Sequence, residues 1–307
     1  MNSRNLIWPS FFIVGAAKCG TTSLWDHLKS HPQVFLPGIK EPHYFTSDVQ
    51  PPEFAAEHCT GDLETYQQLY QPAKGFAAIG DASTGYLWDQ NAARRIHEVS
   101  PNAKIIVILR DPVVRAHSQY LMELLKGVET EQSFYKALRR EVVPNEACRL
   151  LTYLYVEAGM YYAQVHRYLE IFGRDQVLVL LFDDLTTRPQ VVLSRVTEHI
   201  GVESISLDTA ELSAPVNPYR KQRFGTAHRL ATRVLSRDLR RKLFPPAVSR
   251  WLRYNSLLYD TKKPPLDAQS RRYLEEIYDP DISRLEELLG RKLPELRKSW
   301  KVAETTG

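Results

Sequence analysis

Residues 11–24 read FFIVGAAKCGTTSL. The four apolar residues that open this stretch predict a short buried strand, and residues 21–30 have the apolar spacing of a helix. Gly15 and Gly20 stand between the two elements, five residues apart. A glycine-containing loop between a strand and a helix is the setting in which backbone N–H groups and the helix N-terminus hold a phosphate. The stretch therefore predicts an anion site, and the alternative is a strand-to-helix turn without a ligand.

The lysine of this loop is displaced from its place in ATP- and GTP-binding loops. Those loops have Lys and then Ser or Thr directly after the second glycine, with the lysine on the β- and γ-phosphates and the hydroxyl on Mg²⁺. Here Thr21 follows the second glycine, and the lysine lies inside the loop as Lys18. This arrangement disfavours a metal-dependent nucleotide hydrolase. No metal is implied, because the sequence contains no acidic or histidine cluster with the spacing of a metal site.

The unit of strand and helix recurs along the chain. Residues 104–109 form a continuous apolar run, which is typical of a strand buried on both faces of a parallel sheet, and residues 113–126 predict a helix after it. Residues 176–182 predict a third strand, between helices at 161–172 and 189–200. The pattern predicts an α/β fold with a central parallel β-sheet flanked by helices.

The C-terminal part differs from the rest in pattern and in charge. We expect a single domain, 1–307, with a helical, basic portion from about residue 217. Its helical spacing is broken by proline pairs and by Pro280, and no strong strand stands out. Residues 217–256 hold eleven Lys or Arg and one acid, so this segment carries +10 and the remainder −6. The segment indicates either an anionic partner or a solvated basic helix face. It contains neither zinc-finger spacing nor an aromatic RNP pattern, which disfavours nucleic acid as the partner.

The composition is that of a globular protein, with 43% hydrophobic and 25% charged residues and a mean hydropathy of −0.35. The apolar runs are far shorter than the roughly 18 residues that span a bilayer, and the first thirty residues lack the features of a signal peptide. Three widely spaced cysteines exclude a disulfide framework. We therefore expect a cytoplasmic protein without a membrane span.

Two motifs together resemble those of sulfotransferases that use 3′-phosphoadenosine 5′-phosphosulfate (PAPS). Residues 14–24 are similar to the 5′-phosphosulfate loop of that family, and residues 109–120, LRDPVVRAHSQY, are similar to its 3′-phosphate motif. In the second motif Arg110 and Ser118 occupy the positions that grip the 3′-phosphate. An arginine offers a fork of donors to an anion. Arg115, in the same motif, either reaches a phosphate or stabilises local structure.

The resemblance implies PAPS as the sulfuryl donor and a P-loop-like phosphosulfate-binding loop. A later basic segment, residues 217–223, resembles the loop that covers the adenosine bisphosphate in the family. The implied donor-binding residues are Ala17, Lys18, Cys19, Gly20, Thr21, Thr22, Ser23, Arg110, Ser118, Arg220, Lys221 and Arg223.

Residues 40–45, KEPHYF, resemble a segment of the heparan-sulfate and bacterial branch of this family, in which a glutamate is the catalytic base. The match assigns that role to Glu41. His43 is a second candidate proton carrier, because an imidazole titrates near neutral pH. Residues 80–86, GDASTGY, resemble another segment of the branch, with Asp81 in place of a glutamate.

The resemblance implies an in-line displacement in which Glu41 takes a proton from an acceptor hydroxyl or amine and Lys18 stabilises the leaving group. The acceptor would be a small molecule or a carbohydrate, and no nucleic-acid partner is expected. Two alternatives stay open. One is a metal-dependent P-loop nucleotide kinase, which would share the fold. The other is a non-catalytic protein that binds a nucleotide or a polyanion through the basic segment.

Overall fold

A computed structural model describes residues 6–49, 62–126, 128–141, 154–204, 220–222, 258–260 and 263–300. A five-stranded sheet lies at the centre, and its strands are β1 Phe11–Gly15, β2 Val34–Phe35, β3 Ala78–Ala82, β4 Lys104–Leu109 and β5 Val177–Leu181. The strands follow the order β2-β3-β1-β4-β5, and each neighbouring pair is parallel. The predicted parallel α/β sheet is confirmed.

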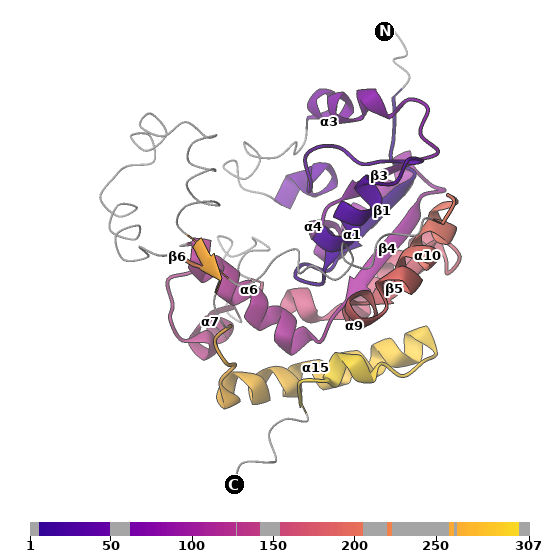
Figure 1. Ribbon diagram of the computed structural model, residues 1–307. Helices are drawn as coiled ribbons and strands as arrows, with labels where there is room; N and C mark the ends of the chain where they lie inside the picture. The colour runs from indigo at the N-terminus through magenta and orange to yellow at the C-terminus, as the bar shows by residue number, and fades with distance from the viewer. Residues whose placement is uncertain are drawn as a thin grey trace, which may run out of the picture.

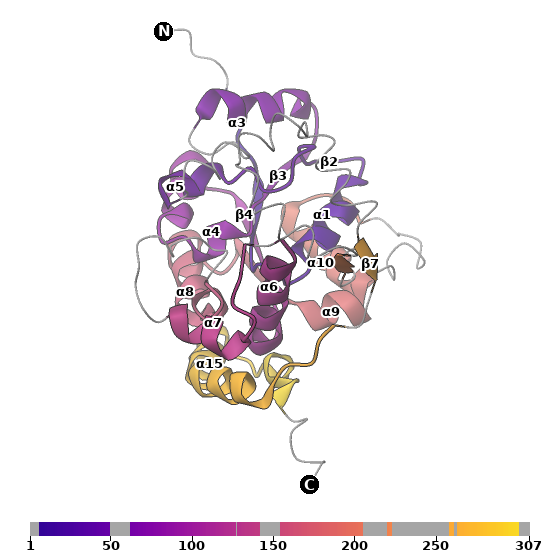
Figure 2. The same cartoon turned by 90° about the vertical axis from the view of Figure 1, so that its left-hand side faces the viewer.

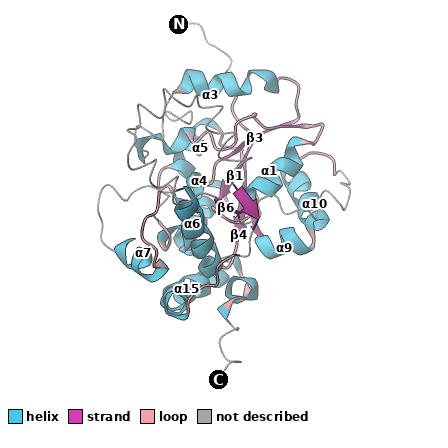
Figure 3. Cartoon of the chain, turned by 60° about the vertical axis from the view of Figure 1, so that its left-hand side comes forward, coloured by secondary structure: helices cyan, strands magenta, loops and turns pink. Residues whose placement is uncertain are grey.

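Helices cover both faces of the sheet. The α-helices are α1 Thr21–Lys29, α3 Leu63–Tyr70, α4 Gly85–Trp88, α5 Ala92–Val99, α6 Pro112–Lys126, α7 Phe134–Glu141, α8 Tyr161–Phe172, α9 Phe182–Thr187, α10 Pro189–Ile200 and α15 Ala268–Leu289. Short 3₁₀ helices are η1 Tyr44–Val49, η2 Gln71–Ala73, η5 Glu157–Gly159 and η7 Pro294–Arg297. Figures 2 and 3 show α4 and α5 on one side of the strands and α1, α9 and α10 on the other.

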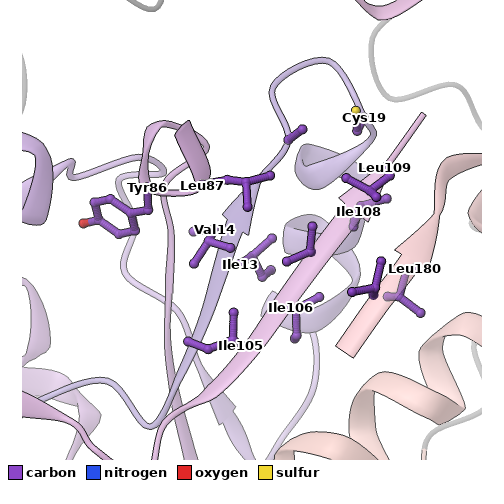
Figure 4. Packing of buried hydrophobic residues seen from close by; sticks show 14 of the residues in the cluster. Ile13, Val14, Cys19, Tyr86, Leu87, Ile105, Ile106, Ile108, Leu109 and Leu180 are labelled. Atoms are coloured by element: carbon purple, nitrogen blue, oxygen red, sulfur yellow. The ribbon is translucent and has the colours of Figure 1, made fainter. Parts of the chain in front are cut away.

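The central strands are buried as their continuous apolar runs predict. The side chains of β1 and β4 form the middle of the core, and those of Ile13, Val14, Ile105 and Ile106 have no exposed surface. Figure 4 shows these residues on the neighbouring strands β1 and β4, with Leu180 of β5 beside β4. A strand buried on both faces gains apolar burial along its whole length, which fixes β1 and β4 at the centre of the sheet.

This topology decides where the predicted site forms. Because the strands are parallel, their carboxyl ends lie at one edge of the sheet, where α/β proteins hold their ligands. The loop after β1 carries Lys18, and Arg110 directly follows β4. Strands β1 and β4 are neighbours, with Phe12 opposite Ile105. The two sequence motifs therefore meet at the same edge.

The sheet contains two strands, β2 and β3, beyond the three that the sequence predicts. Strand β3 reads AIGDA, so that a glycine and an aspartate interrupt its apolar pattern. Gly80 is required by packing, since a Cβ there would lie 2.2 Å from Cζ of Phe11 on β1. The contact that selects glycine is made by a strand far away in sequence, and for that reason a local pattern does not identify β3.

The C-terminal part also differs from the expectation. Helix α15 continues through Pro280 and is not broken there (Figure 1). A proline inside a helix costs about 3 kcal/mol. Leu274 and Tyr278 before it and Ile282 and Leu285 after it are fully buried, and burial of each contributes roughly 1.5–3 kcal/mol. Packing on both sides of the proline thus outweighs its cost.

Two short strands occur in the C-terminal portion after residue 217, where no strong strand is expected. Strand β6 Arg220–Gln222 pairs antiparallel with β7 Leu258–Asp260. The backbone of Arg220 and Lys221 is therefore part of a strand rather than of a loop. The side chains of these two residues, and Arg223 as a whole, lie outside the described residues.

None of the helices that the structure describes is both long and apolar enough to cross a membrane. Within the same residues, no group of three or more His, Cys, Asp or Glu side chains is placed to hold a metal ion. The assignment of residues 1–307 to a single domain stays a prediction.

Candidate active site

The loop between β1 and α1 has the backbone of an anion site. Gly20 precedes α1 in the left-handed conformation, with φ of 85°, and a Cβ there would lie 2.9 Å from the ring of Phe182. Both the conformation and the space therefore require glycine. The helix begins with the bond from Leu24 N–H to Gly20 O. The N–H groups before that bond have no carbonyl partner within the helix, which suits an anion.

The residues of this loop are buried to different degrees. Ala17, Lys18, Gly20, Thr22 and Ser23 are half-buried, whereas Cys19 and Thr21 are buried. The backbone N–H of Cys19 donates to Ala16 O over 3.2 Å, and its Sγ lies 3.8 Å from the hydroxyl oxygen of Tyr161. Cys19 thus holds the shape of the loop.

Arg110 joins the two sequence motifs. Its Nη1 donates to the carbonyl oxygen of Lys18 over 3.2 Å, and its guanidinium lies 4.3 Å from the centre of the Phe182 ring. The hydroxyl of Tyr161 donates to Arg110 O over 2.9 Å. These contacts fix a planar cation beside the loop after β1, as a site for a phosphate group requires.

Lys18 stands in an unusual environment for a lysine. Its backbone is left-handed, with φ of 68°, and its Nζ lies 3.2 Å from Sδ of Met122 on α6. Burial lowers the pKa of Lys18 to about 8, with further lowering by Lys126 and Arg110 and opposite contributions from Glu123 and Glu41. The structure thus brings Arg110 and Glu41 within electrostatic reach of Lys18.

The two remaining residues of the second motif have different places. Ser118 is half-buried on α6, eight residues after Arg110. Arg115 is fully buried, where its Nη1 donates to Oε1 of Gln119 over 2.6 Å and its Nη2 donates to the carbonyl oxygen of Tyr155. Of the two roles considered for Arg115, the structural one is therefore correct, since its guanidinium joins α6 to the segment before η5.

Glu41 lies in a charged cluster with its sequence neighbours. Oε1 accepts from Nζ of Lys40 over 2.6 Å, and Oε2 lies 3.1 Å from Nε2 of His43. The Glu41 side chain is 31% exposed, whereas His43 is buried. Burial alone would raise the pKa of Glu41, but Lys40 and His43 hold the pKa well below its usual range. The carboxylate is ionised and therefore in the protonation state of a base.

The backbone of this segment is held in place from β3. Glu41 and His43 have φ of 63° and 55°, a conformation that is rare for residues other than glycine. The N–H of Glu41 donates to Ala82 O over 3.0 Å, and the N–H of His43 donates to Oγ of Ser83 over 3.2 Å. The hydrogen bonds to the end of β3 maintain the turn that presents Glu41.

Asp81 is the buried support of this turn. Its carboxylate accepts hydrogen bonds from Ser83 Oγ at 2.8 Å and from the hydroxyls of Tyr66 and Tyr86, each at 2.9 Å. Burial raises the pKa of Asp81 to about 6, and the three hydroxyls oppose this rise. Since Asp81 has no exposed surface, it supports Glu41 through Ser83 rather than facing an acceptor.

We expect Asp81→Asn to lower the free energy of unfolding by about 2–4 kcal/mol. The amide replaces one acceptor oxygen of the carboxylate with an NH₂ group, which is itself a donor and cannot accept from the hydroxyls around it. Urea denaturation measures this loss, with Tyr66→Phe as a milder control that removes one of the three bonds. At a temperature where the variant is folded, turnover should stay within about tenfold of wild type. A far larger loss of turnover in the folded variant would make Asp81 the base.

Lys263 is a site residue that the sequence analysis missed. It lies three residues after β7 and shortly before α15. Its side chain is exposed overall, but partial desolvation of the ammonium, together with Arg110 and Lys18, lowers its pKa to about 8. It is thus a third cation close to the loop after β1. The sequence feature that could have identified it is the pair of lysines, Lys262-Lys263, directly before Pro264-Pro265. The proline pair alone indicates only a break in helical spacing.

Comparison with known proteins identifies relatives of this chain. Residues 9–206 match the model of a family described as the sulfotransferase family. The chain is 27% identical over 250 residues to human carbohydrate sulfotransferase 15, covering 64% of this chain and 44% of that protein. It is 28% identical over 202 residues to mouse heparan sulfate glucosamine 3-O-sulfotransferase 6, covering 66% of this chain and 54% of that protein. The chain thus spans about half the length of these relatives.

A solved structure is similar over nearly the whole chain. The crystal structure of a sulfotransferase from Alicyclobacillus acidocaldarius superimposes with a TM-score of 0.72 at 28% identity, and the match covers 95% of this chain and 100% of that one. The similarity extends beyond residues 9–206 to the C-terminal part that carries Lys263 and α15.

Proposed function

From the premise that the chain belongs to the sulfotransferase family, we propose that it transfers a sulfuryl group from PAPS to a hydroxyl or amine of an acceptor. The observation that carries this proposal is the convergence of three cations, Lys18, Arg110 and Lys263, at the loop after β1, with Glu41 within electrostatic reach.

The cation cluster fits a donor with several negative charges. Lys18 and Arg110 lower the affinity of Lys263 for a proton, and Arg110 also lowers that of Lys18. Such a cluster is unfavourable when empty and is stabilised by a polyanion. The loop N–H groups and Lys18 would hold the 5′-phosphosulfate, and Arg110 with Ser118 would hold the 3′-phosphate. When bound, PAPS supplies the sulfuryl group that is transferred.

Each protein group would have one chemical task. Glu41 is ionised and accepts the proton of the acceptor as the new bond forms. Lys18 places a positive charge where negative charge develops on the leaving oxygen. Since sulfuryl transfer resembles phosphoryl transfer, the contribution of the protein lies mainly in position and charge.

We propose a carbohydrate as the acceptor. Support comes from the relatives, which are named carbohydrate sulfotransferase and heparan sulfate glucosamine sulfotransferase. A screen with labelled PAPS and a panel of oligosaccharides, phenols and alkyl alcohols tests this, with transfer to oligosaccharides expected. The cytoplasmic location stays a prediction, and cell fractionation tests it.

We expect the protein to bind 3′-phosphoadenosine 5′-phosphate (PAP), the product of PAPS, without Mg²⁺ and much more tightly than 5′-AMP or ATP with Mg²⁺. Arg110→Ala should weaken PAP binding about tenfold to a hundredfold, because a charge-assisted contact contributes roughly 1.5–3 kcal/mol. Isothermal titration measures these affinities.

The matched control for Arg110 is Arg94→Ala, which removes an exposed arginine on α5 that pairs with Glu98; its PAP affinity should equal that of wild type. The same titrations test the alternatives. Tightest binding of ATP with Mg²⁺ would favour the kinase. PAP binding without transfer from PAPS to any acceptor class would favour a non-catalytic protein.

A further inference from the structure

The carboxylate of Asp111 joins the site to the C-terminal part of the chain. Asp111 directly follows Arg110, precedes α6 and is buried. Its Oδ1 accepts from the N–H groups of Val113 and Val114 over 3.0 and 3.3 Å, which caps the start of α6. Its Oδ2 accepts from the N–H of Ser299 over 2.9 Å. One carboxylate therefore binds both the first turn of α6 and a segment 188 residues further along the chain.

The segment that carries Ser299 is fixed on α15, which lies against α6 (Figure 2). We call this segment, residues 294–300, the C-terminal strap. The side chain of Leu296 is fully buried, and Nε and Nη2 of Arg297 donate to side-chain oxygens on α15 over 2.8 and 2.9 Å. Nη1 of Arg271, also on α15, donates to the carbonyl oxygen of Ser299. The N–H that Asp111 accepts from is thus held at a fixed place.

The C-terminal strap has a second contact close to the Arg110 guanidinium. Nζ of Lys298 lies 2.6 Å from Oδ2 of Asp183, which directly follows Phe182, and the Phe182 ring lies 4.3 Å from that guanidinium. Because 70% of the Lys298 side chain is exposed, this ion pair contributes little. The buried bond to Asp111 is therefore the contact through which the strap acts on the site.

The spacing of Arg110 and Ser118 depends on the start of α6. Arg110 lies next to Asp111 in the chain, and Ser118 lies in the second turn of the helix that Asp111 caps. Groups that bind one anion together have to be held to within about 0.5 Å of their productive positions. A carboxylate that is fixed at both oxygens supplies this precision, since it holds the helix start against α15.

We propose that Asp111 is a positioning residue for the 3′-phosphate of the donor and that the C-terminal strap, by binding its Oδ2, fixes Arg110 and Ser118 relative to each other. The inference rests on the proposed function, in which these two residues hold the 3′-phosphate. Asp111 does not touch the donor, because backbone N–H groups occupy both of its oxygens. Its effect is confined to the share of the affinity that the 3′-phosphate supplies.

The test compares PAP with 5′-AMP, which lacks the 3′-phosphate, by isothermal titration at a temperature where all variants are folded. Asp111→Asn keeps an oxygen for the start of α6, since asparagine also caps helices, but places an NH₂ group against the N–H of Ser299. PAP affinity should fall about threefold to tenfold, and 5′-AMP affinity should stay within about twofold of wild type. General destabilisation would not change the ratio of the two affinities.

A second variant acts on the same bond from its other end. Arg271→Met releases the carbonyl oxygen of Ser299 and should also lower the preference for PAP over 5′-AMP. In the double variant with Asp111→Asn the preference should be no lower than in Asp111→Asn alone, because both changes remove one contact. Steady-state kinetics should show a raised KM for PAPS in Asp111→Asn and a kcat within about twofold of wild type.

Two controls are matched to these variants. Arg272→Met removes the next arginine of α15, which is exposed. Ser299→Ala keeps the N–H and removes a buried hydroxyl that has no hydrogen-bond partner among the described residues. Both should keep the wild-type preference for PAP. An unchanged preference in Asp111→Asn, or an equal loss in Arg272→Met, would overturn the inference.

Failure of the proposed function gives a different result. Wild type would then bind PAP no more tightly than 5′-AMP, and the 3′-phosphate role of Arg110 and Asp111 would fall together with it. Hydrogen exchange in the donor-free protein still decides whether the C-terminal strap fixes α6. The N–H groups of Val113 and Val114 should exchange about fivefold faster in Arg271→Met than in wild type or Arg272→Met. Equal exchange in all three proteins would contradict the structural part of the proposal.

Discussion

Glu41→Gln should lower turnover by roughly 10²–10⁴-fold and leave PAP affinity within about threefold of wild type. Glutamine keeps the size of the side chain and can still accept from Lys40, but it cannot take a proton. Glu41 is half-buried beside Lys40 and His43 and lies within reach of Lys18. Initial rates with labelled PAPS and an acceptor, together with PAP titration, separate the two effects.

The surroundings of Glu41 add a pH dependence to this result. Because Lys40 and His43 hold the pKa of Glu41 well below its usual range, the carboxylate stays ionised at pH values where an ordinary glutamate takes up a proton. Lys40→Met should raise that pKa and move the acid limb of kcat/KM to higher pH. If Glu41→Gln instead keeps most of its activity, the base is reassigned, with His43 as the first candidate.

Lys18→Met should damage both binding and turnover. In the proposed function the ammonium faces the donor in the ground state as well as in the transition state, so we expect PAP binding to weaken about tenfold and kcat/KM to fall by roughly 10²–10³-fold. Titration of PAP and steady-state kinetics with PAPS measure the two losses. Methionine retains an unbranched side chain of similar length, so the loop should keep its shape.

The control for Lys18 is Lys29→Met. Lys29 lies in the last turn of α1, where its ammonium stands 4.5 Å from the ring centre of Trp25. It belongs to the helix that follows the loop but is remote from the start of that helix. Both PAP affinity and turnover should be those of wild type. Equal losses in the two variants would indicate a general effect of lysine removal rather than a role of Lys18.

Local sequence was sufficient for the strand-loop-helix unit and for two of the three cations. The apolar runs of β1 and β4 are continuous because both strands are buried on both faces. Gly20 is required by its own left-handed backbone, and Lys18 is identified by its position in the loop between the two glycines. Parallel strands then bring Arg110 to Lys18 without further information, since their carboxyl ends share one edge of the sheet.

Contacts between distant segments decided the rest. The ring of Phe11 selects glycine at position 80, and the carbonyl oxygen of Tyr155 fixes the role of Arg115. Desolvation in the folded chain, with Arg110 and Lys18, lowers the pKa of Lys263. Pro280 lies inside α15 because buried residues on both sides of it outweigh its cost. Residue type and spacing specify what a side chain can do, whereas its charge state and its partners depend on burial and on neighbours that only the folded chain brings together.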